Sequence, residues 1–207
     1  TKWNNSKNLA RKIILNMKKI DTFLKDYINY LSDELLKVNS DNLNLAADEI
    51  LKKIREKSKI FVCGNGGSAA IANHYICDFL KFFRQKTNLK PKIISLSDNI
   101  ETITAISNDL DYKFIFSYQA ESLCKKNDLV LIISSSGNSK NVVELLKFSK
   151  KNKIKTIGFS GFSGGYLKRN CDIPIHVNAK NYGISEDSHH ILMHVILQYL
   201  IERVKNK

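Results

Sequence analysis

Hydrophobic residues recur at two different spacings, and the change from one to the other divides the chain near residue 57. Over residues 7 to 56 apolar positions return every three or four residues, as in LARKIILNMKKIDTFLKDYINYLSDELLKV, which is typical of amphipathic helices. This pattern predicts two or three helices before any strand. Leu31, Leu35 and Leu36 extend a stripe that is too apolar for one solvated helix, so we expect a helix bundle or a subunit contact there.

Short β-branched and aromatic runs begin at residue 58, and each ends in Gly, Ser or Asn, in most cases before a helical stretch. Alternation of strands with helices predicts a parallel sheet covered on both faces. We therefore expect an α/β fold, a doubly wound three-layer αβα sandwich. The five expected strands are KIFVCG (59–64), PKIISLS (91–97), DLVLIISSS (128–136), IKTIGFSG (154–161) and CDIPIHVN (171–178).

The last helix is expected over residues 186–205. Its run HHILMHVILQYLIERV is too apolar to be solvated along its whole length, so it should pack against the sheet or a partner. A chain of 207 residues suits one domain. In this division the N-terminal helices, residues 1–57, belong to the same domain as the α/β unit over residues 58–207.

Charge and cysteine content argue against nucleic-acid-binding, disulfide-rich and zinc-finger proteins. The formal net charge is +13, from 33 basic and 20 acidic residues, but the lysines are scattered over every segment, so nucleic-acid binding is the weakest alternative. Four cysteines without a CxxC pair predict reduced core thiols, not a disulfide framework or a zinc finger. No apolar run reaches the roughly 18–20 residues of a membrane span, and the signal-peptide pattern is missing. We expect a cytoplasmic protein with no membrane partner.

Two polar loops follow predicted strands. The first, GNGGS (64–68), includes Asn65, Gly66, Gly67 and Ser68; its glycines let the backbone turn sharply and approach a ligand, and we expect Ser68 to cap the next helix. Because the spacing is GxGGS, a dinucleotide fingerprint is not indicated. A plain strand-to-helix turn explains this loop about as well as a ligand loop does.

The second loop, SSSGNS (134–139), lies between an apolar strand and a helix. Hydroxyls, free backbone N–H groups and the positive end of a helix dipole converge there, which suits a phosphate monoester. Adjacent serines after a buried strand are costly to bury without partners, so we interpret the loop as a phosphate site. The candidate phosphate ligands are Ser134, Ser135, Ser136 and Ser139.

Acid and base candidates come from two predicted helices. His74 and Asp78 are four residues apart and project from one face just after the glycine loop. Glu186, His190 and His194 form a polar stripe at successive i, i+4 steps on an otherwise apolar helix. Each histidine alone is better explained as a core residue, but their coincidence with two carboxylates beside a phosphate loop favours a site.

The two loops and the intervening LSDNIETITAISND (96–109) occur in the order and spacing of the phosphoheptose isomerase branch of the sugar isomerase (SIS) family, which the chain resembles from about residue 58 to 203. The resemblance implies a five-stranded flavodoxin-like sheet and a homotetramer whose N-terminal helices help to form the core. It also implies that Asn65, Ser68 and Asp109 line the sugar site, some of them from a neighbouring subunit.

The chain departs from this family pattern at two positions. Asp78 stands where the family has Glu, and Glu186 stands where it has Gln. Because Asp is one methylene shorter, its reach as a general base changes, and either Glu186 or Asp78 remains the candidate base. His74, Asp78, Glu186 and His194 are also candidate ligands for zinc, which some relatives carry, although an ene-diol route requires no cofactor.

The leading hypothesis is aldose–ketose isomerisation of sedoheptulose 7-phosphate to D-glycero-D-manno-heptose 7-phosphate, a heptose for lipopolysaccharide, capsule or another surface glycan by resemblance. Glu186 or Asp78 would move a proton between C1 and C2, and His194 would serve the two oxygens. The alternative is a non-catalytic SIS module that binds a phosphosugar as a regulatory signal or acts as a scaffold. Retention of four acid–base candidates favours the enzyme.

Overall fold

Five parallel strands form the centre of the molecule in the computed structural model, which describes residues 19–206. The sheet order is β2-β1-β3-β4-β5. Each strand lies inside a run predicted from the sequence, and the α/β class with an all-parallel five-stranded sheet is confirmed. The strands are β1 (Lys59–Gly64), β2 (Lys92–Ser95), β3 (Leu129–Ser134), β4 (Lys155–Ser160) and β5 (Ile173–His176).

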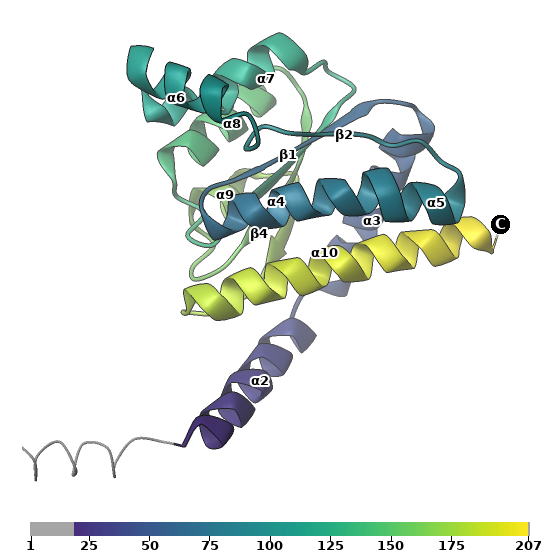
Figure 1. Ribbon diagram of the computed structural model, residues 1–207, viewed down its shortest axis with the longest axis vertical. Helices are drawn as coiled ribbons and strands as arrows, with labels where there is room; N and C mark the ends of the chain where they lie inside the picture. Colours follow the sequence, from purple (N-terminus) through teal and green to yellow (C-terminus); the bar gives the residue numbers. More distant parts are fainter. Residues whose placement is uncertain (1–18, 207) are drawn as a thin grey trace, which may run out of the picture.

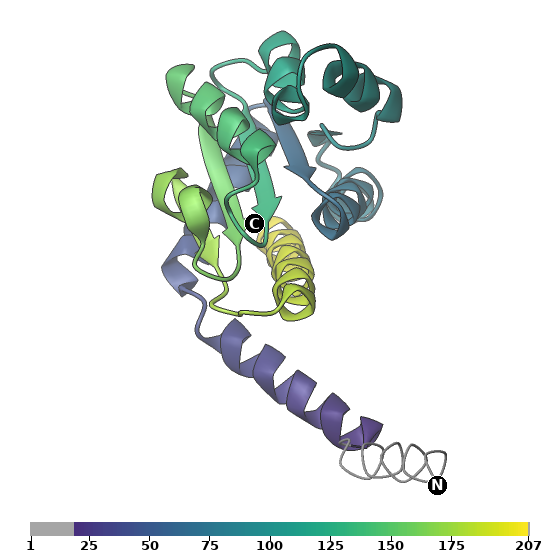
Figure 2. The same ribbon diagram turned by 90° about the vertical axis from the view of Figure 1, so that its left-hand side faces the viewer.

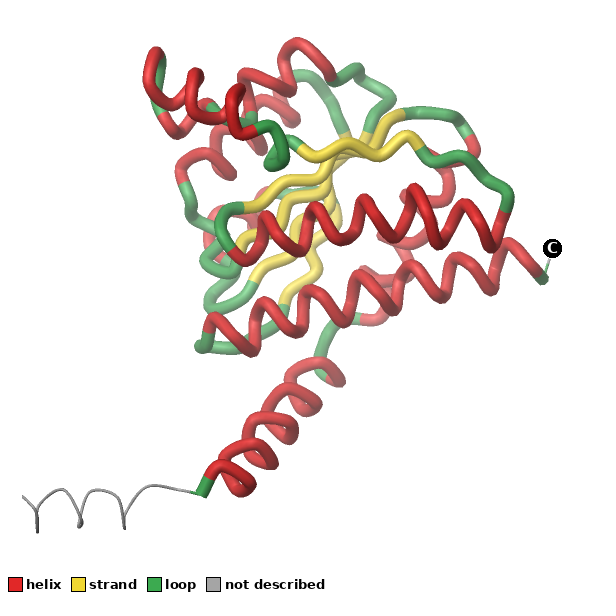
Figure 3. The backbone as a smooth tube through the Cα atoms, in the orientation of Figure 1, coloured by secondary structure: helices red, strands yellow, loops and turns green. Residues whose placement is uncertain are grey.

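Helices cover both faces of this sheet, as the layers in Figure 3 show. Successive side chains of a strand point to opposite faces, so Ile60 and Val62 of β1 enter one core while Phe61 and Cys63 enter the other. The first core is closed by α3 (Ser40–Arg55), α4 (Gly67–Cys77), the π-helical turn after α4 (Asp78–Phe83) and α10 (Tyr182–Lys205). The short helix α5 (Arg84–Thr87) continues that turn and has no buried residue. The second is closed by α6 (Ile100–Asp109), α7 (Ser117–Leu123), α8 (Lys140–Lys151) and α9 (Gly165–Asn170).

The chain reverses its direction of winding between β1 and β3. It leaves β1 into α4 on one face, and it leaves β3 into α8 on the other face (Figure 2). Open α/β sheets bind ligands at such a switch point, outside the carboxyl ends of the strands. The glycine loop follows β1 and the serine loop follows β3, so the topology brings together the two loops that the sequence singled out.

Helix α2 (Ile20–Leu36) projects from the body of the molecule in Figures 1 and 2. Tyr27 holds it to α10 by donating a hydrogen bond of 2.6 Å from its hydroxyl to Asp187 Oδ2. Burial and this bond raise the pKa of Tyr27 to about 12, so the hydroxyl remains a donor. Large apolar side chains are nevertheless exposed along the helix: Ile20, Phe23, Leu24, Ile28 and Leu36.

Only part of the apolar stripe that contains Leu31, Leu35 and Leu36 is buried. Leu31 and Leu35 pack against the first core, whereas Leu36 is 84% exposed. The part of the expected helices before residue 19 lies outside the described residues.

None of the helices over residues 19–206 has the length and apolar character needed to cross a membrane. The boundary between the N-terminal helices (1–57) and the α/β unit (58–207) stays a prediction.

Helix α10 begins four residues earlier than the sequence pattern indicated. Asn181 is its N-cap and accepts a hydrogen bond of 3.0 Å from the backbone N–H of Ile184 on its side chain. The apolar periodicity starts only after this first turn, which explains the difference.

His189 of α10 is fully buried against Phe159 of β4, and burial lowers its pKa to about 4 from a usual value of 6.5. The unfolded chain therefore binds this proton at a higher pH than the folded chain does, and stability falls as pH drops from about 6.5 towards 4. Lowering the pH from 7 to 5 should therefore decrease the free energy of unfolding by about 2 kcal/mol through His189. Urea unfolding of His189→Leu should show a correspondingly smaller loss over this interval, and equal losses in both proteins would contradict the assignment.

Candidate functional site

The glycine loop turns β1 directly into α4. Gly66 has φ +51° and precedes the first residue of α4, a conformation that side chains rarely adopt. Ser97 fixes the strand end, since its hydroxyl donates to the carbonyl of Gly64 at 2.9 Å and accepts from its N–H at 3.1 Å. The expected capping role of Ser68 is wrong: Gly66 is the N-cap, and Ser68 is the buried second residue of the helix.

The serine loop is held against the segment that joins β4 to α9. Gly161 N–H donates to Ser135 O at 2.8 Å, and Leu167 N–H donates to Gly137 O at 3.0 Å. Gly137 has φ +64°, and a Cβ at this position would collide with the carbonyl oxygen of Gly164. The loop therefore requires glycine both for its turn and for this close approach.

Hydroxyls and a helix end meet in this loop. Ser134 and Ser135 are buried, and Ser135 Oγ has no hydrogen-bond partner among the described residues. Ser139 is the N-cap of α8, yet its side chain makes no capping hydrogen bond. An orphaned buried hydroxyl beside the positive end of a helix is a favourable environment for an anion.

An amide pair that the sequence interpretation missed joins the two loops. Asn65 Nδ2 donates to Asn141 Oδ1 at 3.0 Å, and Asn141 Nδ2 donates to Asn65 Oδ1 at 2.7 Å. Tyr112 adds a third bond from its hydroxyl to Asn65 Oδ1 at 3.0 Å. Asn141 is buried in the first turn of α8. In the sequence only the position of Asn141, two residues after Ser139, pointed to a role at this site. No sequence feature singled out Tyr112.

The acid–base candidates of the two helices come together where α4 lies beside α10 (Figure 1). His74 Nε2 is 3.0 Å from His194 Nε2. Asp78 Oδ2 is 3.4 Å from His74 Nε2 and 3.2 Å from His194 Nε2. Asp78 begins a π-helical turn (Asp78–Phe83) that continues α4, a local irregularity that is frequent at functional sites.

His190 joins this cluster, although the sequence indicated only its place in the polar stripe and no catalytic or metal-binding role. Its ring centroid is 4.6 Å from that of His74 and 4.6 Å from that of His194. Burial, and then the neighbouring imidazoles, lower the pKa of His190. The ring is therefore neutral near pH 7 and keeps a lone pair for a ligand.

Glu186 lies next to the glycine loop. A Cβ on Gly67 would collide with the Glu186 carboxylate and would stand 2.7 Å from its Cδ. Among the described residues this carboxylate makes no hydrogen bond or ion pair. It is therefore an unpaired carboxylate beside the first residue of α4.

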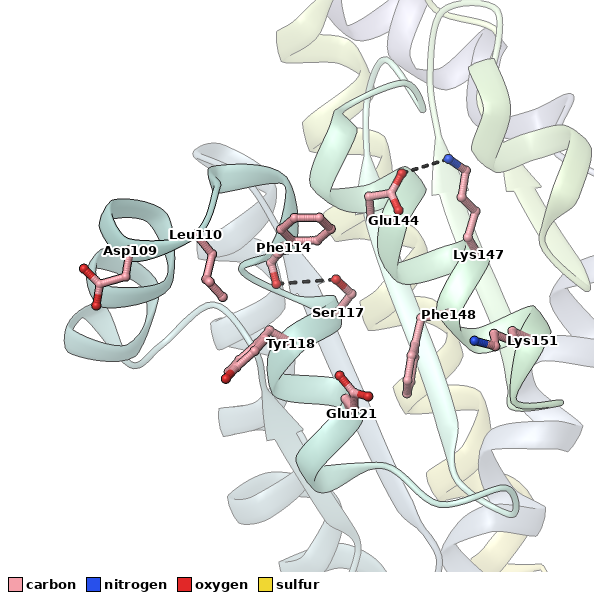
Figure 4. A pocket seen from close by; sticks show the side chains of 10 residues that line it. All are labelled: Asp109, Leu110, Phe114, Ser117, Tyr118, Glu121, Glu144, Lys147, Phe148 and Lys151. Carbon is pink, nitrogen blue, oxygen red and sulfur yellow. Dashed lines mark hydrogen bonds and ion pairs between the residues drawn. The ribbon is translucent and has the colours of Figure 1, made fainter.

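Asp109 lies elsewhere in this chain, at the end of α6. It is at the rim of a cavity of about 700 Å³ between α6, α7 and α8 (Figure 4), whose walls include Tyr118 and Phe148. Its carboxylate accepts a hydrogen bond of 2.8 Å from Asn108 Nδ2. Its predicted place in the sugar site, which a neighbouring subunit would have to complete, stays a prediction.

The histidine cluster fits a metal ion. His74, His190 and His194 can each offer a nitrogen, and these atoms all lie within 4.8 Å of one another. Two buried atoms at the cluster, Asp78 Oδ2 and His190 Nε2, lack any hydrogen-bond partner within residues 19–206. Orphaned polar atoms of this kind call for an explanation such as an ion, and imidazole with carboxylate suits zinc.

Comparison with known proteins identifies the family of the chain. Residues 23–161 match the SIS domain family. A probable phosphoheptose isomerase of Thermoplasma acidophilum is 38% identical over 180 residues, which are 86% of this chain and 98% of the relative. The phosphoheptose isomerase of Campylobacter concisus is 35% identical over 78% of this chain and 85% of its own length. The solved phosphoheptose isomerase of Francisella tularensis superposes with a TM-score of 0.81 at 26% identity, covering 88% and 96% of the two chains.

Proposed function

The chain belongs to the SIS domain family, and from that premise we propose that it is a phosphoheptose isomerase, an aldose–ketose isomerase that acts on sedoheptulose 7-phosphate. The observation that carries the proposal is the joined pair of loops at the switch point between β1 and β3. One loop offers hydroxyls and a helix end to an anion, and the other borders an unpaired carboxylate.

The phosphate end of the substrate binds the serine loop in this proposal. Hydroxyls and backbone N–H groups take the place of lysines, so the anion is held by directed hydrogen bonds and the α8 dipole. Asn65 and the glycine loop then contact the sugar chain. The proposed phosphate ligands are Ser134, Ser135, Ser136 and Ser139, and the proposed sugar contacts are Asn65, Gly66, Gly67, Ser68 and Asp109.

Glu186 is the proposed base. It removes a proton from C1 of the ketose, the carbonyl oxygen on C2 is protonated, and an ene-diol forms; the proton returned to C2 and the loss of the O1 proton then give the aldose. His194 moves the protons between the two oxygens. Asp78 is less suited to act as the base, because its carboxylate lies against His74 and His194 and orients them.

A divalent cation is a further part of the proposal. The ligands expected from the sequence are His74, Asp78, Glu186 and His194. When bound there, zinc would polarise the substrate carbonyl and the adjacent hydroxyl.

The assembly and the product are proposed from the family resemblance. A homotetramer would cover the apolar side chains that α2 exposes in a single chain. The product, D-glycero-D-manno-heptose 7-phosphate, would serve the synthesis of a surface glycan.

Incubation of the purified protein with sedoheptulose 7-phosphate, with and without added zinc, tests the activity. We expect the aldose product to accumulate. Absence of turnover in both conditions would overturn the isomerase. A thermal shift with sugar phosphates that leaves the ligand chemically unchanged would instead support a binding module.

Replacement of Gly67 by alanine tests the place of the base. The added methyl group would push the Glu186 carboxylate aside, and a displacement near 1 Å can cost about 10²-fold in kcat. Stability should change little, because Gly67 is the first residue of α4 and does not have a positive φ, so alanine adds no backbone strain. Steady-state kinetics and thermal unfolding measure the two effects. In a Glu186→Gln background the same change should have no further effect on kcat, and an additive loss would contradict the link.

A further inference from the structure

We propose that His190 is the third imidazole ligand of a transition-metal site formed with His74 and His194, and that Glu186 is not a ligand of that metal. This inference deepens the proposed function and rests on it for the role left to Glu186. It changes the ligand set expected from the sequence, in which Glu186 held the metal and His190 had no role.

Three of the five histidines of the chain gather at this point. His74 comes from α4, while His190 and His194 are one turn apart on α10. The three rings approach edge to face or tilted, at centroid distances of 4.6, 5.1 and 4.6 Å. Two nitrogens bound to one zinc ion at about 2.0–2.1 Å lie roughly 3.3 Å apart. The 3.0 Å between His74 Nε2 and His194 Nε2 is near that spacing.

Hydrogen bonding among these side chains cannot satisfy the cluster. A bond between His74 Nε2 and His194 Nε2 uses one donor and one acceptor. Within the described chain His190 Nε2 then has no hydrogen-bond partner, and Asp78 Oδ2, although within ion-pair distance of His74 and His194, accepts no hydrogen bond. A buried polar atom that lacks a hydrogen bond lowers the stability of the folded protein, and this cost is larger when the group is charged. One cation coordinated by the nitrogens, with the Asp78 carboxylate beside it, removes this cost at both atoms.

Glu186 occupies a different place. Its carboxylate contacts Gly67 at the start of α4, whereas His74 lies seven residues further along the same helix. Seven residues correspond to a rise of about 10 Å, and Glu186 is absent from the group of ligand atoms that lie close together. Three protein ligands with one position left open is the arrangement of catalytic zinc sites. Glu186 therefore remains unbound and able to exchange protons with the substrate.

Metal binding to the full-length protein, measured after removal of metal with a chelator and without substrate, tests this assignment. Zinc affinity is obtained by competition with a chromophoric chelator, and cobalt(II) reports the ligand set through its visible absorption. His190→Leu should lower zinc affinity by at least about 100-fold, since loss of outer-shell partners alone costs 10–100-fold, and should change the cobalt spectrum. His176→Gln, outside the cluster on β5, should bind as the parent does.

Glu186→Gln provides the opposing comparison. It should bind zinc with the parent affinity and give the parent cobalt spectrum. The proposal is overturned if His190→Leu binds one zinc ion as tightly as the parent, if Glu186→Gln loses the affinity instead, or if the parent binds no zinc. Circular dichroism of the metal-free variants shows whether they are folded. Because substrate is absent, failure of the isomerase with intact metal binding would remove only the proposed function.

Discussion

Glu186→Gln should lower kcat by about 10²–10⁴-fold, the usual contribution of general acid–base catalysis. The amide keeps the size and position of the carboxylate next to Gly67, so substrate binding should change little and the loss should appear in kcat, not in KM. The carboxylate makes no ion pair among the described residues, and thermal stability should therefore be preserved. Steady-state kinetics with sedoheptulose 7-phosphate provide the measurement.

Asp78→Asn is the matched comparison for this result. Asp78 contacts two imidazoles that Glu186 does not contact, so its amide should disturb metal affinity and the orientation of His194. If Glu186→Gln retained kcat while Asp78→Asn lost it with unchanged metal binding, Asp78 would be the base.

Gly137→Ala should disrupt the serine loop (134–139). A side chain at φ +64° costs about 1–2 kcal/mol, and the new Cβ would also collide with backbone at Gly164, which cannot move without displacing the start of α9. We expect a loss of at least about 2 kcal/mol, which lowers Tm by roughly 4–8 °C in a chain of this size. KM should rise steeply, because the serine hydroxyls no longer converge.

Gly66→Ala separates the cost of the backbone conformation from the cost of the collision with Gly164. Gly66 has a similar φ of +51° but nothing within 4 Å of an added Cβ, so only the cost of its sparsely populated backbone conformation, about 1–3 kcal/mol, applies. Scanning calorimetry of both variants compares them. Equal losses would mean that the approach to Gly164 is unimportant.

The strands could be located from sequence because each bears a local signature. A buried parallel strand is apolar on both faces, as Leu129 to Ile133 are, and the glycines and serines after β1 and β3 mark where the backbone turns. Helical spacing placed His74 and Asp78 on one face of a helix, and Glu186, His190 and His194 on one stripe of another. These patterns depend on neighbours within a few residues, which a sequence displays directly.

Features that depend on contacts between distant segments could not be located in this way. Tyr112 reaches Asn65 across 47 residues, and His190 completes a cluster with a residue on another helix. Ser68 was expected to be a cap because serine favours that position, but the strained Gly66 ends the turn one residue before the helix begins. The early start of α10 depends on Asn181, whose side chain, and not the apolar pattern, defines the first turn.

The reciprocal amide bonds between Asn65 and Asn141 fix the distance between the glycine loop and the start of α8. Each amide uses both its oxygen and its nitrogen in the pair, so neither loop can shift without breaking both bonds. In the proposed complex the phosphate therefore lies at a fixed distance from Glu186, whose carboxylate lies against Gly67. A sugar phosphate with fewer carbons would then bind the serine loop equally well, but its C1 would not reach the carboxylate. In that complex chain length would be selected through kcat more than through binding.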